Sequence, residues 1–493
     1  MSTPSTRTPL RNATLGSLTG VTTPAYDRAT VTPGIVHFGV GGFHRAHQAC
    51  YLDKLLANDP SWGISGVGVR PADVRMRDAL VPQDCLYTLT LKAPDGTVTT
   101  SVIGSIIEYR YAHDGPEAVL ERLADPATRI VSLTVTEGGY NFSASTGEFD
   151  ASDPEIVADL AGNAPPTTVF GLVVEGLARR RDRGVPSFTV MSCDNIAGNG
   201  RMARSTFLAY ARLRDADLAD WIEGHTSFPN SMVDRITPAT PAELADEVAA
   251  RTGIADAWPV VAEPFTQWVI EDDFSCGRPS FEKAGVQVVA DVTPYELMKL
   301  RLLNSGHQAL CYFAYLLGYR YVHDAAEDPD IRNLLRRYMT EEGKPTLEPL
   351  PGVDVDGYID TLLERFANPA IADTVARLCQ DSSNRIPKWL VPVIGDRLTQ
   401  HGGVDFAAAV VASWTRYDEG VDEQGDPIDV DDPLADRLVG LARRSRTEPL
   451  AFLSEESLFG DLATREEFTT PYLWALETLR TKGARETLRE LLA

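Results

Sequence analysis

Residues 299–307, KLRLLNSGH, place a lysine, an asparagine and a histidine at short intervals. In an α-helix, which advances about 100° per residue, these three residues and Glu296 lie within an arc of about 140° measured from Lys299. A lysine amine can accept the proton of an alcohol, and amide N–H groups can bind the oxygen that remains. The spacing of Lys299, Asn304 and His307 therefore predicts a proton-handling site on one side of a helix.

The start of this helix is marked by Thr293 as N-cap and Pro294 at the first helical position. Glu296, three residues after the cap, either closes a capping box or takes part in the chemistry, and the two roles are compatible. Gly306 inside the helix costs about 1 kcal/mol relative to alanine. Such a glycine indicates that something approaches the backbone closely, for which a flat cofactor ring is one candidate.

Each polar residue of the helix also has a purely structural explanation. His307 could be a buried histidine bonded to its neighbours, and Lys299 could extend its charged end to solvent along an apolar stem. A lysine that loses solvation instead favours its neutral form, which prepares it to act as a general base. The helix alone leaves these alternatives open.

Composition narrows the function classes. The chain has 493 residues, 43% of them hydrophobic, which is enough for two or three domains with buried cores. Lys and Arg number 46 against 70 Asp and Glu, a net charge of −24. Such a charge repels nucleic acid and anionic membrane surfaces, so neither is an expected partner.

The six cysteines form no CxxC motif and no close pair. This spacing argues against a zinc site and against a disulfide framework, so we expect reduced thiols and a cytoplasmic protein. The first thirty residues contain no apolar run typical of a signal peptide, and no segment has the length and apolar character of a membrane span.

The first half of the chain alternates between short β-branched runs and helical patterns. This alternation is typical of an open, doubly wound parallel sheet of the Rossmann type. The expected strands are residues 34–38, 62–69, 130–135 and 187–192, and the expected helices are residues 45–58 and 167–181.

From about residue 290 the pattern is helical throughout. We therefore expect a dinucleotide-binding domain over residues 1–288 and an α-helical catalytic domain over residues 289–493, with the active site in a cleft between them. The expected helices are residues 294–319, 328–342, 355–366, 371–378, 387–400, 406–417 and 433–444.

A glycine turn links the first strand to the first helix. Gly39 and Gly41 fill the first two positions of a GxGxxG motif, but His44 stands at the third, so an ordinary glycine turn is an alternative. The context of strand, turn and helix favours a dinucleotide-binding turn, with its backbone close to the pyrophosphate. The residues expected to contact the cofactor are Gly39, Gly41, Gly42, Phe43, His44 and Arg45.

Arg70 and Asp73 follow the second strand, where the adenosine ribose of a dinucleotide lies. A carboxylate there accepts bonds from the ribose hydroxyls and favours NAD, whereas Arg70 could favour the extra phosphate of NADP. Asp73 makes NAD the expected cofactor. His44 and His47 have the spacing of two metal ligands, but no third ligand is visible, so no metal is expected. Anion contact by His44 and Arg45 explains this segment better.

The glycine turn and the helix of Lys299 resemble those of the polyol-specific long-chain dehydrogenases/reductases, the mannitol dehydrogenase family. The family's signature, a lysine followed by asparagine five residues on and histidine three further, is met by Lys299, Asn304 and His307. The resemblance extends over nearly the whole chain. It is carried by residues 35–47, 191–195, 268–272 and 298–310.

The resemblance implies a monomeric, metal-independent enzyme that interconverts D-mannitol and D-fructose with NAD and uses Lys299 as general base. It also implies that Asn195 and Asn304 bind the reacting oxygen, although Asn195 could be an ordinary turn residue after a strand. His307 would orient the substrate or the lysine. The remaining implied positions are Glu137 and Glu296 on the proton's route to water, and Asp234, Arg377 and Arg385 at the outer hydroxyls.

Two departures from the family pattern affect the expected substrate. Gln380 stands where some mannitol dehydrogenases have histidine, and Arg385 stands where some members have lysine. Fructuronate reductase is therefore an alternative, because Arg377 and Arg385 could bind a carboxylate, as is arabinitol or sorbitol dehydrogenase. A sensor that binds NAD without catalysis is an alternative of another class, against which the intact Lys299, Asn304 and His307 argue.

Overall fold

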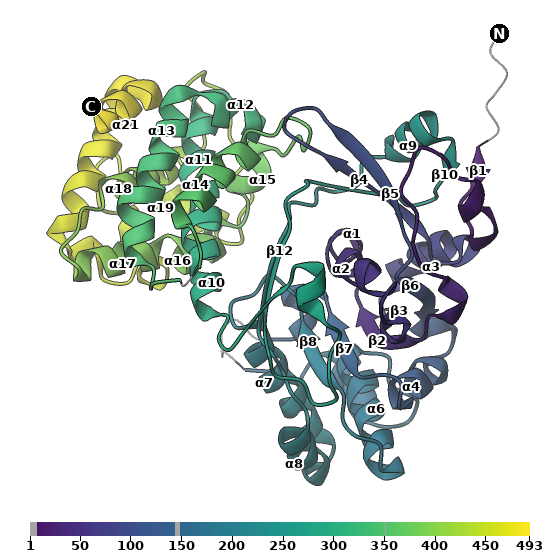
Figure 1. Cartoon of the computed structure of the whole chain (residues 1–493). Helices are drawn as coiled ribbons and strands as arrows, with labels where there is room; N and C mark the ends of the chain where they lie inside the picture. The colour runs from purple at the N-terminus through teal and green to yellow at the C-terminus, as the bar shows by residue number, and fades with distance from the viewer. Residues whose placement is uncertain (1–6, 143–147, 351) are drawn as a thin grey trace. The chain divides into compact units, whose positions relative to one another are not determined.

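The computed structural model describes residues 7–142, 148–350 and 352–493. The chain forms two compact units, Met1–Thr293 and Pro294–Ala493. In the described residues every named strand belongs to the first unit, and the second unit is helical (Figure 1). The predicted fold class, a Rossmann-type sheet followed by a helical region, is confirmed.

A five-stranded parallel sheet forms the centre of the first unit. Its order is β6 (Ile106–Tyr111), β3 (Gly63–Gly68), β2 (Pro33–Phe38), β7 (Ile130–Leu133) and β8 (Thr189–Ser192). The chain leaves β2 toward β3 and β6 on one side and later adds β7 and β8 on the other. The strand order therefore reverses beside β2, and ligands of doubly wound sheets bind at such a switch point.

Both faces of this sheet are covered by a hydrophobic core. Since successive side chains of a strand point to opposite faces, neighbouring residues lie in different cores. On β2, Ile35 packs in a core that includes residues of α2 (Gln48–Leu55), whereas Val36 and Phe38 pack in a second core. The second core includes residues of α4 (Pro116–Ala124) and α6 (Val169–Arg183), which Figure 1 shows beside the sheet. This double burial explains the continuous apolar runs in the sequence.

The helix predicted over residues 45–58 is wrong in its boundaries. The structure has α1 (Gly42–Ala46) and then α2, with a break at His47, whose φ is −123° and ψ is −90°. The strand and helix patterns also missed the two three-stranded sheets. These have the order β11-β4-β5 and β13-β12-β9, with the strands β11 (Val260–Ala262), β4 (Tyr87–Lys92), β5 (Val98–Ile103), β13 (Gln287–Val289), β12 (Gln267–Glu271) and β9 (Ser231–Asp234).

The second unit packs around α11 (Ser305–Leu316) and α18 (Asp405–Tyr417), which are buried over most of their length. The long helix α21 (Glu466–Leu492), which the sequence analysis did not predict, packs against α18 and bends at Gly483. The helix α14 (Val355–Phe366) has its predicted bounds. Other predicted helices are shorter or divided, as α13 (Pro329–Arg337), α15 (Val375–Cys379), α16 (Ser382–Trp389), α17 (Val391–Thr399) and α19 (Ala435–Arg444).

The helix of Lys299 is not the continuous α-helix predicted over residues 294–319. It consists of α10 (Thr293–Met298), the π-helix η9 (Lys299–Asn304) and α11. At the end of η9 the Ser305 N–H donates to the carbonyl of Leu300, five residues back. A second π-helix, η10 (Tyr338–Gly343), continues α13. Single π turns occur frequently at functional sites.

Glu342 ties η10 to α18. Its carboxyl group is buried and accepts the backbone N–H groups of Phe406 and Ala407, each at 2.8 Å. Burial outweighs these two bonds and raises the pKa of Glu342 from 4.5 to about 8. The folded chain therefore keeps a proton on Glu342 that the unfolded chain loses at lower pH.

The free energy of unfolding of the second unit should accordingly fall as pH rises between about 4.5 and about 8, by up to about 1.4 kcal/mol per pH unit. Glu342→Gln cannot titrate, so its stability should depend less on pH in this window. Urea unfolding followed by circular dichroism at about pH 5.5 and about pH 7.5 measures the difference. Glu341→Gln, at an exposed neighbour, is the control. Parallel pH dependences of the wild type and Glu342→Gln would contradict the assignment.

Candidate active site

The glycine turn lies where β2 leaves the sheet. Gly39 has φ +91°, and a Cβ atom on it would lie 2.1 Å from the carbonyl oxygen of Thr134, which follows β7. The Gly39 carbonyl accepts the Gly41 N–H at 2.7 Å and the Thr134 hydroxyl at 2.7 Å. Only glycine fits both this backbone conformation and this close approach. Gly41 is exposed, and the nearest atom to a Cβ atom on it would be the Gly39 carbonyl oxygen at 3.8 Å, an ordinary contact distance.

Gly39→Ala should raise the KM for the dinucleotide by about tenfold or more, because the turn must move away from Thr134 and strained backbone costs of order 1–3 kcal/mol. Gly96→Ala separates the two causes, since Gly96 also has a positive φ (+82°) but has no atom within 4 Å of a Cβ atom. Steady-state kinetics and dinucleotide titration of both variants test this. Equal behaviour of the two variants would show that the contact with Thr134 is unimportant.

His44 is a buried residue of α1, directly after the turn. Its ring stacks on that of His37, with centroids 3.4 Å apart and an interplanar angle of 13°. His37 in turn lies 2.8 Å from the Ser132 hydroxyl and 3.0 Å from the Thr134 hydroxyl. Burial lowers the pKa of His37 to about 3 and holds the pKa of His44 well below its ordinary value. Both rings are therefore neutral near pH 7, and His44 offers no positive charge to an anion.

Arg45 is also buried and directs its guanidinium to backbone carbonyls. Its Nε donates to Gly41 at 3.3 Å, its Nη1 donates to Trp258, and its own carbonyl accepts the Tyr87 hydroxyl at 2.7 Å. The prediction for His44 and Arg45 was anion contact near the pyrophosphate. The structure instead places both inside the unit, because carbonyl oxygens stabilise a buried guanidinium. Phe43 and Gly42, beside them, are half-buried.

Asp73 and Arg70 shape the exit of β3. The Asp73 Oδ2 accepts the Val69 N–H at 3.0 Å and the Arg70 N–H at 2.9 Å. Arg70 reaches across the sheet edge and donates to the Val135 carbonyl at 3.0 Å. One oxygen of Asp73 therefore stabilises the turn that follows β3. This structural role was not predicted from the sequence. Arg70 connects the exits of β3 and β7.

The loop after β7 carries Glu137 at an exposed position. Thr136, just before it, has φ +68°, which is strained for a β-branched residue. Asp194 holds this loop: its carboxylate accepts the N–H groups of Val135 (3.1 Å) and Thr136 (2.7 Å) and the hydroxyl of Tyr140 (2.7 Å).

Asn195 directly follows Asp194 and is exposed. Asp194 therefore brings the loops after β7 and β8 together, which places Glu137 and Asn195 on neighbouring loops at the carboxyl edge of the sheet. This role of Asp194 was not predicted from the sequence. Its position between a buried strand and Asn195 was the available signal, but an acidic residue after a strand is common.

Asp234 lies outside the five-stranded sheet, at the buried end of β9. This strand is fixed to the exit of β8, because the Ser231 hydroxyl donates to the Ser192 carbonyl at 2.6 Å. The Asn199 side chain adds bonds to Ser231 and to the Asp194 carbonyl, at 2.7 Å and 3.0 Å. The strand that ends at Asp234 is thus hydrogen-bonded to residues 192 and 199, which lie on either side of Asn195 in the sequence.

In the second unit, η9 brings Lys299 and Asn304 to the same face. Residues five apart lie one above the other in an i→i+5 helix, whereas on an α-helix they would be about 140° apart. Both side chains are buried, with 7% and 5% of their surface exposed, as is Glu296. Among the residues that the structure describes, the Asn304 Nδ2 has no hydrogen-bond partner. A buried N–H donor without a partner is an expected feature of a group that binds a substrate oxygen.

Gly306 does not leave room for a cofactor ring. A Cβ atom on it would lie 2.5 Å from the Met339 Cε, so a side chain of η10 fills the space. His307 is half-buried and packs against Phe366, with ring centroids 4.5 Å apart. The expectation of a flat ring at Gly306 is therefore wrong, and the glycine serves packing within the second unit.

Arg377 and Arg385 lie close together, because the Arg385 Nη1 donates to the carbonyl of Arg377 at 3.3 Å. The Arg377 Nε donates to Asp373 at 2.6 Å, and this carboxylate raises the pKa of Arg377. Gln380, the departure from the family pattern, donates to Asp431 at 2.7 Å. Arg377 and Gln380 are thus each already paired with a carboxylate.

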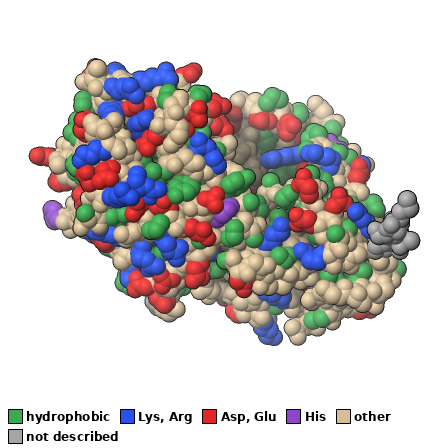
Figure 2. Space-filling view, turned by 90° about the horizontal axis from the view of Figure 1, so that it is seen from above, with side chains coloured by type: hydrophobic (Ala, Val, Ile, Leu, Met, Phe, Trp, Pro, Cys, Tyr) green, Lys and Arg blue, Asp and Glu red, His purple; other side chains and the backbone are tan. Residues whose placement is uncertain are grey.

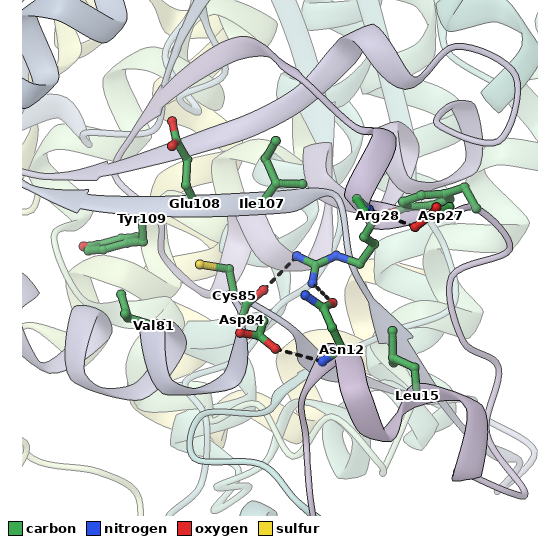
Figure 3. Close-up of a pocket in the computed structure, with 12 residues that line it drawn as sticks. Asn12, Leu15, Asp27, Arg28, Val81, Asp84, Cys85, Ile107, Glu108 and Tyr109 are labelled. Atoms are coloured by element: carbon green, nitrogen blue, oxygen red, sulfur yellow. Dashed lines mark hydrogen bonds between the residues drawn. The ribbon is translucent and has the colours of Figure 1, made fainter.

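A cavity of about 530 Å³ in the first unit includes none of the predicted site residues among its lining. Figure 3 shows Arg28 at its centre, bonded to the carbonyl of Asp84 and to Asn12. Arg28 also donates to the carbonyls of Gly104 and Ile106, at 2.9 Å and 2.8 Å. These bonds attach the N-terminal arm to the beginning of β6, and the arginine is occupied by them.

Within the described ranges, no group of three or more His, Cys, Asp or Glu side chains is placed to hold a metal ion. None of the helices in these ranges is both long and apolar enough to span a membrane. On the face shown in Figure 2, basic and acidic side chains are interspersed.

The glycine turn at the switch point of a parallel sheet defines the first unit as a Rossmann-type dinucleotide-binding unit. Residues 33–283 match the mannitol dehydrogenase Rossmann domain, and residues 291–480 match the mannitol dehydrogenase C-terminal domain. The chain therefore belongs to the mannitol dehydrogenase family, as the motifs indicated.

Individual relatives cover nearly the whole chain. Mannitol 2-dehydrogenase of Phaeosphaeria nodorum is 47% identical over 98% of this chain and 85% of its own length. The structure of Pseudomonas fluorescens mannitol 2-dehydrogenase in ternary complex with NAD and D-mannitol is similar with a TM-score of 0.86 and 45% identity, covering 98% of this chain and 99% of that one. A substrate-free D-sorbitol dehydrogenase has a TM-score of 0.93 and 41% identity, covering 98% and 100%.

Proposed function

We propose that this chain interconverts D-mannitol and D-fructose by metal-independent hydride transfer, with Lys299 as general base. The chain is an NAD-dependent polyol dehydrogenase, as its family membership and its similarity to the mannitol 2-dehydrogenase complex with NAD and D-mannitol indicate. The observation that carries the chemical proposal is the π turn, which sets the Lys299 amine and the unpartnered Nδ2 of Asn304 on one face.

Oxidation of a secondary alcohol requires a base for the hydroxyl proton and donors for the alkoxide that develops. Lys299 takes the proton, while the side-chain amides of Asn304 and Asn195 donate to the oxygen. Bound NAD supplies the hydride acceptor, and the exposed backbone at Gly41 gives its pyrophosphate a close approach. His307, held against Phe366, orients the substrate or the lysine.

The remaining site residues have supporting roles in this proposal. Glu296, buried on the helix of Lys299, and Glu137, exposed after β7, provide the route of the proton to water. Asp73 selects NAD with the carboxylate oxygen that does not close the turn, and Arg70 lies beside it at the cofactor. His44 and Arg45 support the turn from below. The groups proposed to bind the outer hydroxyls are Asp234, Arg377 and Arg385.

Oxidation of D-sorbitol is a second candidate, because the similarity to D-sorbitol dehydrogenase extends over 98% of this chain with a TM-score of 0.93. Reduction of a hexuronate is less well supported, since a carboxylate ligand would compete with Asp373 for Arg377. We also propose that the enzyme acts as a cytoplasmic monomer, which sedimentation velocity and cell fractionation would test.

Initial rates of nicotinamide absorbance test the function. D-mannitol, D-sorbitol and D-arabinitol are offered with NAD⁺ or NADP⁺, and D-fructose and D-fructuronate with NADH, each with and without EDTA. We expect D-mannitol and D-fructose to give the highest kcat/KM, NAD⁺ to exceed NADP⁺, and EDTA to have no effect. Preference for D-sorbitol or D-fructuronate would overturn the substrate assignment, and inhibition by EDTA would overturn the metal-independent mechanism.

A further inference from the structure

The register of η9 determines which side chains face each other. The carboxyl-terminal end of η9 has an i→i+5 bond, from the Ser305 N–H to the Leu300 carbonyl. If the segment returned to α-helical bonding, Asn304 would rotate away from Lys299, because residues five apart are about 140° apart on an α-helix. The two groups proposed for proton transfer and oxygen binding therefore depend on a turn that few sequences adopt.

Side-chain hydroxyls stabilise this turn. The Ser305 Oγ donates to the Leu300 carbonyl at 3.0 Å, five residues back, whereas a serine in an α-helix bonds three or four residues back. The Tyr338 hydroxyl of η10 lies 3.3 Å from the Arg301 carbonyl, and burial raises its pKa, so it keeps its proton as a donor. The carbonyls of Leu300 and Arg301 thus accept hydrogen bonds from side-chain hydroxyls, which are not part of the backbone hydrogen bonding of a helix.

The two π-helices also approach each other closely at a glycine of η10. A Cβ atom on Gly343 of η10 would lie 2.9 Å from the Leu302 Cδ2 and 3.2 Å from the Arg301 carbonyl oxygen of η9. Gly306, in the first turn of α11 directly after η9, meets η10 through a side chain, since a Cβ atom on it would lie 2.5 Å from the Met339 Cε. Gly343 is therefore the glycine at which the backbone of η10 approaches that of η9.

Each π-helix is also fixed to another part of the second unit. Glu342 attaches η10 to the first turn of α18 through two backbone N–H groups at 2.8 Å. Arg301 attaches η9 to Asp396 of α17 at 2.7 Å and to the Thr346 carbonyl at 2.6 Å. The register of η9 is therefore held from outside the segment and not by its own sequence alone.

We propose that η10 holds η9 in its i→i+5 register, which makes Gly343 and Ser305 positioning residues for Lys299 and Asn304. This inference rests on the proposed function, since it assumes that Lys299 is the base. Neither residue is assigned to substrate or cofactor. They act by fixing where the catalytic side chains lie.

The first test is Gly343→Ala, with Gly440→Ala as matched control. Gly440 is an exposed glycine of α19 with no atom within 4 Å of a Cβ position. Displacing a catalytic group by about 1 Å can cost on the order of 10²-fold in rate. We expect Gly343→Ala to lower kcat by about that factor with the KM for NAD⁺ within about twofold of wild type, and Gly440→Ala to leave both unchanged.

A double-mutant cycle with Lys299→Ala separates positioning from general damage to the fold. If Gly343 acts through Lys299, adding Gly343→Ala to Lys299→Ala should lower kcat by much less than it does in the wild type. Equal factors in the two backgrounds would show a merely structural effect and overturn the proposal. Full activity of Lys299→Ala alone would instead overturn the proposed function.

Ser305→Ala provides an independent test if Gly343→Ala does not fold. The change removes one hydroxyl and keeps a good helix former. We expect kcat to fall roughly threefold to tenfold, the equivalent of one hydrogen bond, and the loss to shrink in the Lys299→Ala background. The inference would be overturned if Ser305→Ala had wild-type kcat and Gly343→Ala either folded with wild-type kcat or did not fold.

Discussion

Lys299→Ala should reduce kcat by at least about 10²-fold while leaving the binding of NADH unchanged. The amine is the proposed acceptor of the substrate proton, and no other amine lies in η9. The residues that shape the dinucleotide turn belong to the first unit and do not include Lys299. Steady-state rates of mannitol oxidation and fluorescence titration with NADH measure the two properties separately.

Lys482→Ala is the matched control, since Lys482 forms an exposed ion pair with Glu490 on α21 and surface pairs contribute little. It should behave as wild type in both measurements. If Lys299→Ala retained wild-type turnover, Lys299 would not be the base. If it lost NADH binding together with turnover, the residue would serve the fold or the cofactor and not proton transfer.

Asn304→Ala should also lower kcat/KM by on the order of 10²-fold, which corresponds to about 3 kcal/mol of transition-state stabilisation. The Asn304 Nδ2 is a buried donor without a partner in the described part of the chain, and its proposed partner is the alkoxide oxygen. The loss should appear mainly in kcat, because the bond strengthens as charge develops on that oxygen. Asn304→Asp, which keeps the shape and removes the N–H donors, should be at least as damaging.

The control for this prediction is Asn333→Ala, at an exposed position of α13 in the same unit. Thermal unfolding of each variant shows whether the fold is intact. A rise in KM with an unchanged kcat would mean that Asn304 binds the substrate and the transition state equally. That outcome would remove Asn304 from the stabilisation of the alkoxide.

The sequence determined the class of fold because its local patterns agree with the final packing. Val36 and Phe38 of β2 are buried on one face and Ile35 on the other, so the strand is apolar throughout and is recognisable as part of a doubly covered sheet. Gly39 is recognisable for a similar reason, since a turn that needs positive φ and close approach admits only glycine. These constraints are local in the sequence.

The direction of a polar side chain was not determined locally. Arg45 and His44 follow the glycine turn, where an anion contact is the natural expectation, yet they point inward to the Gly41 carbonyl and the His37 ring. In the sequence, Asp194 is an ordinary loop residue. Its role follows from the pairing of β7 with β8, which brings the Thr136 N–H to its carboxylate. The partners of these residues are distant in the sequence, so only tertiary structure identifies them.

The spacing of Lys299 and Asn304 shows this division most clearly. The sequence supplied the residue types and hence the chemistry of a base and an oxygen donor, but a separation of five residues leaves the two side chains about 140° apart on the predicted α-helix, at the two edges of the expected arc. The π turn brings them to one face, and in our proposal Gly343 and Tyr338 of η10, which pack against it, hold it in that register. The chemistry was therefore determined by the sequence, whereas the geometry that unites these groups was decided by a contact between two distant segments.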